Sequence, residues 1–196
     1  MDNFAAAWAA LDAAPRRALE LAYTALTSGG LPVGAVLVDA GGAIVAEGRN
    51  RAYDPPGGPD VLQGTPLAHA ELNVLAAVPT DRDLSPDTLW STHEPCSMCA
   101  AAAAFTGVGA VRHVAPDPWA VAAGRPASDS VPLGAPEWAL VAGVLFVLGV
   151  AARVGTGNPT VTGNPAAARI ALDLLPAPTG GSLEELIAPV WDRISG

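Results

Sequence analysis

The stretches Leu67-Ala-His-Ala-Glu71 and Glu94-Pro-Cys-Ser-Met-Cys99 decide the fold, because the metal-ligating side chains that they carry must meet. The only two cysteines of the chain form one C-x-x-C segment, which precedes an alanine-rich run that favours helix. In a helix, Cys96 and Cys99 share one face, and the positive helix end stabilises their thiolates. His69, at the start of a separate helix, completes a set of three ligands. Structural zinc takes four protein ligands whereas catalytic zinc keeps one position for water, so three ligands indicate catalysis.

Glu71 adds a carboxylate two residues from His69. A hydrolysis that expels ammonia needs a group that takes the proton from zinc-bound water and passes it to the departing amine, and a carboxylate at this spacing can reach both. The order H-x-E and then P-C-x-x-C resembles the signature of the zinc nucleobase deaminases. Because both halves occur in this order, they form a specific signal.

Other interpretations of these residues stay open. The C-x-x-C segment could be a redox pair, and His93 or His113 could close a structural zinc site with four ligands. A redox pair does not account for His69 and Glu71, and a structural site leaves Glu71 without a role. The chain could also be a non-catalytic, zinc-stabilised module that binds a metabolite or a partner, and the presence of Glu71 argues against this.

The composition bounds the kind of partner. A chain of 196 residues is long enough for one domain with an appendage, and 51% hydrophobic with 15% charged residues suits a compact globular protein. The net charge of −9 works against binding a polyanion, because phosphate contacts need a basic surface. We therefore expect a small heterocyclic molecule as substrate and no nucleic-acid partner.

The amino terminus and the cysteines indicate a cytoplasmic protein. Residues Met1 to Phe4 lack the basic region and the apolar core of a secretory signal. Two cysteines that serve as metal ligands need a reducing compartment. The membrane-like run Trp138 to Ala152 has fifteen residues, fewer than the ~20 that span a bilayer, so we expect a buried helix and no membrane partner.

Hydrophobic spacing and turn residues predict a mixed α/β sandwich. A turn at Gly41-Gly42 joins two predicted strands as an antiparallel pair, and the strand, helix and strand that follow predict a parallel crossover. The proline- and glycine-rich segment 51–66 is predicted to be a surface loop beside the site. The predicted helices cover residues 3–11, 16–28, 69–78, 96–105 and 137–153, with two more beginning at Pro165 and after Ser182, and the predicted strands cover residues 33–39, 43–48, 88–93 and 110–115.

On these segments the chain resembles the cytidine deaminase-like zinc hydrolase superfamily, and within it the branch of the tRNA adenosine and guanine deaminases. The resemblance covers roughly residues 16 to 118 and implies a three-layer α-β-α sandwich with a mixed sheet, here followed by C-terminal helices. The matching pieces are Pro32–Val38, Gly48–Asn50, Ala68–Glu71 and Glu94–Cys99, with Val108-Gly109 and Asp117 as weaker matches.

The resemblance also assigns roles to single residues. It implies that His69, Cys96 and Cys99 bind zinc as the cofactor and that Glu71 shuttles protons. It further implies that Asn50 contacts the bound base, and that the backbone of Ala70 and the carbonyl of Glu94 line the reacting centre. His93 either stacks over the substrate ring or fills the pocket wall.

These observations predict a zinc-dependent hydrolytic deaminase that acts on a free aminopurine base or nucleoside, or on a related aminated heterocycle. A cytosine or cytidine deaminase and a tRNA adenosine deaminase are the alternatives. We expect a deaminase core over residues 1–135 and a helical extension over residues 136–196, packed on the core or at a subunit interface. The predicted helix 137–153 is apolar nearly all round and must be covered on more than one side, which predicts a homodimer.

Overall fold

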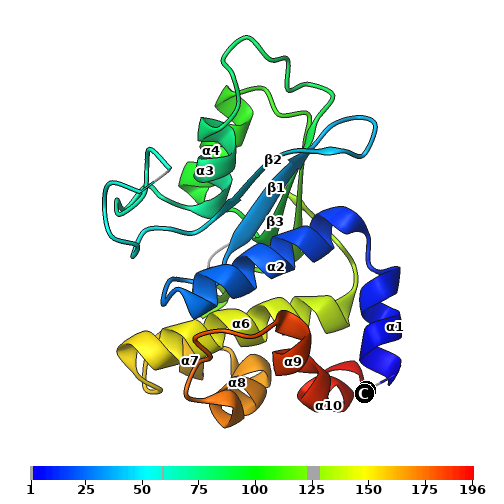
Figure 1. The fold of residues 1–196 in the computed structure, drawn as a ribbon, viewed down its shortest axis with the longest axis vertical. Coiled ribbons are helices and arrows are strands. Elements are labelled where there is room, and N and C mark those ends of the chain that lie inside the picture. The colour runs from blue at the N-terminus through cyan, green and yellow to red at the C-terminus, as the bar shows by residue number, and fades with distance from the viewer. Residues whose placement is uncertain (1, 59, 123–128) are drawn as a thin grey trace.

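A computed structural model of the protein describes residues 2–58, 60–122 and 129–196, and within them the strands form one mixed sheet (Figure 1). The order of the strands is β2-β1-β3-β4-β5. The strand β1 pairs antiparallel with both β2 and β3, whereas β3 with β4 and β4 with β5 are parallel. The strands are β1 (Gly34–Val38), β2 (Ile44–Arg49), β3 (Thr88–His93), β4 (Ala110–Ala115) and β5 (Val131–Pro132).

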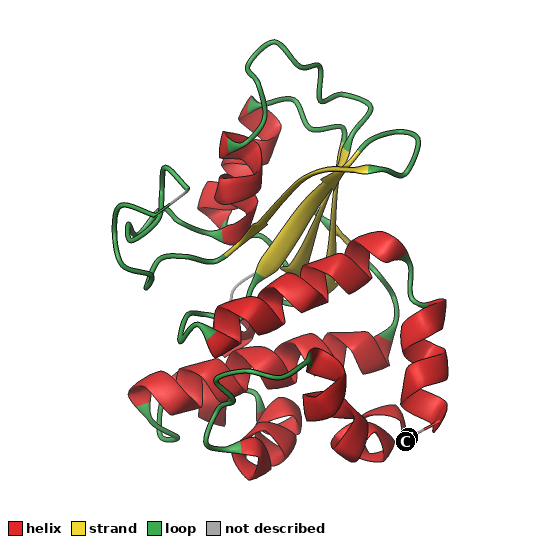
Figure 2. Ribbon diagram, in the orientation of Figure 1, coloured by secondary structure: helices red, strands yellow, loops and turns green. Residues whose placement is uncertain are grey.

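Helices cover both faces of this sheet, with α3 and α4 on one face and α2 and α6 on the other (Figures 1 and 2). This arrangement confirms the predicted three-layer sandwich and its parallel crossover. The helices are α1 (Asp2–Ala10), α2 (Ala13–Thr27), α3 (Ala70–Ala76), α4 (Ser97–Phe105), α5 (Pro118–Ala122), α6 (Pro136–Val154), α7 (Pro159–Thr162), α8 (Pro165–Ala171), α9 (Leu183–Ile187) and α10 (Trp191–Ser195), with 3-10 turns at Leu172–Leu174 and Ala188–Val190.

The hairpin between β1 and β2 forms where the glycine pair predicts it. Asp39 Oδ1 accepts hydrogen bonds from the backbone N–H groups of Gly41 and Ala43, and Gly42 has a φ of +86° that favours glycine. Every residue of β1 is buried, because helices lie on both of its faces. At Gly34 the helix α2 comes so close that an added Cβ would lie 2.1 Å from the Ala18 carbonyl oxygen.

The helix α6 lies inside the fold and is covered by the protein's own elements. Its apolar side chains share one core with α1, α2 and the helices that follow it, including a cluster of aromatic rings from Phe4, Trp8, Trp138 and Trp191. Within the described residues, α6 is long and apolar enough to cross a membrane, but 61% of its apolar window is buried, as in a core helix. The uncovered face that predicted a homodimer is therefore filled within one chain.

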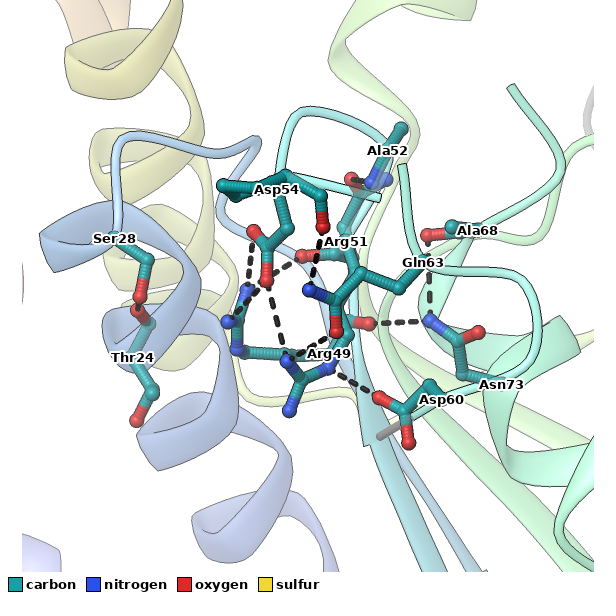
Figure 3. Close-up of polar contacts among 12 residues, drawn as sticks. Thr24, Ser28, Arg49, Arg51, Ala52, Asp54, Asp60, Gln63, Ala68 and Asn73 are labelled. Atoms are coloured by element: carbon teal, nitrogen blue, oxygen red, sulfur yellow. Dashed lines mark hydrogen bonds and ion pairs between the residues drawn. The ribbon is translucent and has the colours of Figure 1, made fainter. Parts of the chain in front are cut away.

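The described residues 51–58 and 60–66 form a surface loop, as predicted, and ion pairs hold it in place (Figure 3). Arg49 Nη2 lies 2.6 Å from Asp54 Oδ2, and Arg51 contacts both Asp54 and Asp60. Behind them, Asn73 of α3 donates to the Arg49 carbonyl oxygen at 2.8 Å, which ties the loop to the helix that carries Glu71. The loop is thus held beside the site.

The short elements α5, α7, α10 and β5 are missing from the sequence prediction. Each has five residues or fewer, and so short a segment shows no recognisable hydrophobic periodicity in the sequence.

Candidate active site

The structure brings His69, Cys96 and Cys99 together. His69 is the residue before α3 and Cys96 the residue before α4, so the starts of two helices meet at this point. The potential ligand atoms of the three residues all lie within 4.8 Å of one another. The two Sγ atoms are 3.6 Å apart, and His69 Nδ1 lies 3.7 Å from Cys96 Sγ and 3.5 Å from Cys99 Sγ.

These separations fit a tetrahedral zinc ion. Zinc bonds of about 2.3 Å to sulfur and about 2.0 Å to nitrogen place two sulfurs about 3.8 Å apart and a sulfur about 3.6 Å from a nitrogen. Two thiolates and one imidazole are also the donor types that zinc prefers. No fourth protein ligand joins this group within the described residues, and His113 instead places its Nδ1 2.7 Å from Ser130 Oγ. The geometry therefore favours an open site over a closed structural one.

The electrostatics of the three groups suit a cation. Contacts with Cys99 and His69 lower the pKa of the Cys96 thiol to about 3, so this sulfur is a thiolate. The contact with Cys96, together with burial, raises the pKa of Cys99, so the sulfurs share one proton until a cation replaces it. The contact with Cys96 also raises the pKa of His69.

Glu71 lies directly beside the ligand group and is buried. The thiol of Cys99 lies 3.5 Å from Glu71 Oε2, and the Ser91 hydroxyl donates to Oε1 at 2.9 Å. Burial raises the pKa of the Glu71 carboxyl, which brings it closer to the range where a carboxyl can both take and give a proton. Ser91 is absent from the sequence prediction, because only the packing of α3 beside β3 brings its hydroxyl to Glu71.

The residues expected to contact a substrate lie around the same cavity, with one exception. Asn50, His93 and Glu94 line it, whereas Ala70 is fully buried in the first turn of α3 and does not. Asn50 Oδ1 accepts the backbone N–H of Ala52, which agrees with the turn role that asparagine often has. The backbone N–H of Glu94 donates to the Ala115 carbonyl oxygen at 2.8 Å, which fixes the peptide before the cysteines.

His93 forms part of the cavity wall. Its ring centroid lies 5.0 Å from that of Phe146 at an angle of 57°, and Thr92 Oγ1 lies 3.2 Å from its Nδ1. Burial lowers the pKa of His93 to about 3, so the ring is neutral. Phe146 belongs to α6, and its contact with His93 joins the C-terminal extension to the site.

The cavity itself has a volume of about 1200 Å³. Besides the metal-ligating group, it is lined by Tyr53 from the 51–66 loop and by Asp117 and Trp119 at the start of α5. Asp117 Oδ1 accepts the Trp119 N–H at 2.9 Å, and burial raises the pKa of its carboxyl. From the C-terminal extension come Phe146, Val150, Arg153, Val154, Asn158, Pro159 and Thr160, none of which the sequence motifs indicate.

With this geometry in hand, comparisons with known proteins confirm the resemblance. The family model of the cytidine and deoxycytidylate deaminase zinc-binding region matches residues 10–115. A tRNA-specific adenosine deaminase of Haemophilus influenzae is 43% identical over 90 residues, which are 44% of this chain and 47% of that protein. A probable cytosine deaminase of Schizosaccharomyces pombe is 33% identical over 94 residues, which are 47% of this chain and 52% of that protein. The chain thus spans about half the length of these two curated relatives.

Among solved structures, a guanine deaminase from Nitrosomonas europaea is 29% identical and superposes with a TM-score of 0.47, covering 60% of this chain and 68% of that chain.

The expectation of no nucleic-acid partner is wrong. A relative that is 43% identical over 90 residues is a tRNA-specific adenosine deaminase. Net charge sums the whole surface and does not describe the potential at one cavity, so a value of −9 does not exclude a nucleic acid. The charge therefore decides neither for a free small molecule nor against RNA.

Proposed function

The chain belongs to the family of the cytidine and deoxycytidylate deaminase zinc-binding region, and from this premise we propose that it is a zinc-dependent aminohydrolase that releases ammonia from an aminated nucleobase. One observation carries the proposal. The ligand atoms of His69, Cys96 and Cys99 lie within 4.8 Å of one another, and the buried Glu71 carboxylate lies 3.5 Å from Cys99 Sγ in the wall of a large cavity.

Zinc, when bound, supplies a Lewis acid that lowers the pKa of water to about 7. His69, Cys96 and Cys99 hold it. Glu71 takes one proton from the attacking water and gives it to the ring nitrogen beside the reacting carbon. It then takes the second proton from the hydroxyl that has been added to this carbon and gives it to the amine, which departs as ammonia as the carbonyl forms. The Ser91 hydroxyl fixes one oxygen of Glu71, so that the other oxygen faces the ligand group.

Further contacts position the substrate. The Glu94 carbonyl oxygen accepts an N–H of the exocyclic amine, and the Asn50 amide bonds the ring edge. The neutral His93 ring and the side chain of Phe146 form an apolar surface against one side of the heterocycle.

We propose an aminopurine, as the free base or within a nucleoside, as the substrate. The cavity is larger than a single ring needs, and relatives include a guanine deaminase and a tRNA-specific adenosine deaminase. Cytosine, cytidine and adenosine within tRNA are the alternatives. Residues 1–135 then form the deaminase core and residues 136–196 an extension that completes the cavity. The thiolate ligands support a reducing, cytoplasmic location.

The test is ammonia release by the zinc-loaded protein from guanine, adenine, cytosine, their nucleosides and a tRNA transcript. Glu71→Gln is the matched control, because it keeps the shape of the side chain and removes its proton transfer. We expect release from a purine compound with the unchanged protein and a loss of at least ~100-fold with the variant. Release from no compound in the panel, with zinc bound, contradicts the proposed activity.

A further inference from the structure

The cavity continues along one face of α6, away from the reacting centre. The residues of α6 that line it are Phe146, Val150, Arg153 and Val154, which follow the spacing of one helical face. Phe146 contacts His93. Because a helix rises 1.5 Å per residue, Arg153 lies roughly 10 Å further along the axis. A bare base does not cover this length, whereas a base with its sugar and a phosphate does.

Two contacts hold Arg153 in place at this end of the cavity. Its guanidinium carbon lies 3.4 Å from the centre of the Tyr53 ring, and its Nη1 donates to the Gly29 carbonyl oxygen at 3.1 Å. Neither contact neutralises the charge, and no carboxylate of the described residues forms an ion pair with Arg153. A guanidinium has five N–H donors, and among the described residues one of those of Arg153 is bonded, to Gly29, so others can bind a ligand. Tyr53 is 49% exposed, so the pair stands at the cavity mouth.

Two nearby arginines, Arg49 at the end of β2 and Arg51 at the start of the loop, are different. Arg49 and Arg51 both pair with Asp54, and Arg51 also pairs with Asp60, as Figure 3 shows. Their charges are paired with carboxylates that hold the loop in place. Among the cavity-lining residues in the described part of the chain, Arg153 is the one arginine, and the chain contains no lysine.

The charges in the cavity are separated. The carboxyl groups of Glu71, Glu94 and Asp117 lie in the part that includes the metal-ligating group, and Arg153 lies two helical turns further along α6. Asn158 and Thr160, which also line the cavity, add an amide and a hydroxyl from the segment directly after α6. A ligand that carries its amine at one end and an anion at the other is oriented by this arrangement.

We propose that Arg153 binds a phosphate group on the part of the substrate remote from the exocyclic amine, so that the preferred substrate is a nucleoside phosphate. This inference rests on the proposed deaminase function. Arginine suits the task, because its planar fork matches the oxygens of a phosphate. The phosphate belongs either to a free nucleotide or to an RNA backbone, and the experiment separates these two sources.

Arg153 also has a structural use, which the experiment must distinguish. It lies in the last turn of α6, where a cation stabilises the helix end, and its bond to Gly29 clips α6 to the end of α2. A purely structural arginine affects all substrates equally. Loss of an arginine that binds phosphate instead lowers kcat/KM for substrates that carry a phosphate and leaves kcat/KM for the others unchanged, so the ratio between them falls.

The test compares kcat/KM for adenine, guanine and cytosine nucleosides, their 5′-monophosphates and short single-stranded RNAs, with the zinc-loaded protein. We expect a preference of about tenfold or more for the phosphate-bearing form, since a charge-assisted hydrogen bond discriminates by this amount. Arg153→Met, which keeps an unbranched stem on Tyr53, should bring the ratio close to one. Arg153→Lys should keep part of it, and the matched control Arg169→Met on the exposed face of α8 should keep all of it.

A ratio near one in the unchanged protein, or a ratio that Arg153→Met does not alter, overturns the proposal. A preference for RNA over the monophosphate that Arg153→Met removes supports it, with the backbone as the source. If no compound is deaminated, the proposed function fails, but calorimetric binding of the same nucleosides and monophosphates to the zinc-loaded protein and to Arg153→Met still decides the phosphate site. Tighter monophosphate binding that Arg153→Met abolishes supports it, and equal binding overturns it.

Discussion

His93 makes the stability of the fold depend on pH, and the dependence can be worked out from its burial. Burial lowers the pKa of the folded His93 to about 3, whereas an unfolded histidine titrates near 6.5. Between these values the unfolded chain binds a proton that the folded chain does not. The free energy of unfolding therefore rises with pH in this window and falls as the solution is acidified.

The magnitude follows from the two pKa values. Where the unfolded state binds a full proton that the folded state does not, the free energy of unfolding falls by about 1.4 kcal/mol for each pH unit of acidification. Integrated from pH 8 to pH 5, this amounts to about 2 kcal/mol, and to about 3 kcal/mol at pH 4. His93→Phe removes the titrating ring and keeps an aromatic ring against Phe146. The free energy of unfolding of this variant should therefore lack the pH dependence that His93 causes.

The assay is urea unfolding of both proteins at pH 8, 7, 6, 5 and 4, with EDTA present so that zinc release does not add a second pH effect. Other titrating groups are common to both proteins and cancel in the difference. We expect the difference in unfolding free energy between the unchanged protein and His93→Phe to shift by about 2 kcal/mol between pH 8 and pH 5 in favour of the variant. A difference that stays constant across this range refutes a neutral, buried His93.

Three more substitutions test the site and its support. Glu71→Gln should keep one zinc per chain by metal analysis while ammonia release falls about 10²- to 10⁴-fold, and loss of the metal would show that Glu71 is a ligand. Cys99→Ala should lose zinc and lower the thermal midpoint, because the metal ties α3 to α4, and an unchanged zinc content would contradict the ligand assignment. Gly34→Ala should destabilise the fold by about 3 kcal/mol or more in urea unfolding, since its Cβ would lie 2.1 Å from the Ala18 carbonyl oxygen; a change below about 1 kcal/mol would mean that α2 and β1 can move apart.

The metal-ligating group could be predicted from sequence because each part of it is local. Cys96 and Cys99 are three residues apart on one helix, and Glu71 follows His69 by two residues, so short motifs fix their relative positions. Only the meeting of α3 with α4 needs tertiary structure, and a shared metal explains why they meet. The longer strands and helices span enough residues for their hydrophobic periodicity to be recognised in the sequence. The structure confirms their predicted bounds to within a few residues.

The cavity wall could not be predicted in this way. Ser91 reaches Glu71 only because β3 lies beside α3, and Phe146 reaches His93 across a separation of more than fifty residues. No period or motif in the C-terminal segment marks Phe146 or Arg153, because their role depends on which face of α6 lies over the sheet. Only contacts between distant segments carry this information.

The argument that predicted a homodimer fails for a related reason, and the homodimer itself stays a prediction. A helix that is apolar on all sides must be covered, and this physical argument holds for α6. The cover comes from α1, α2 and several C-terminal elements, among them α9 and α10 with five residues each. Because such short helices have weak sequence signals, the chain appeared to have too little material to bury α6. The stacked and edge-on contacts of Phe4, Trp8 and Trp191 with one another and with Trp138 fill that space.

The family match and the cavity lining end at different places in the chain. The match stops at residue 115, after the three residues that could hold a metal and after Glu71, which we propose carries protons. The cavity lining continues to Thr160. Since α6 is packed into the same core as α2, tertiary packing holds its face toward the site. We expect a change at Phe146, Val150 or Arg153 to alter the cavity wall while the contacts of Glu71 with Ser91 and Cys99 remain. We therefore expect substitutions along this face of α6 to change the choice of substrate more than the reaction itself.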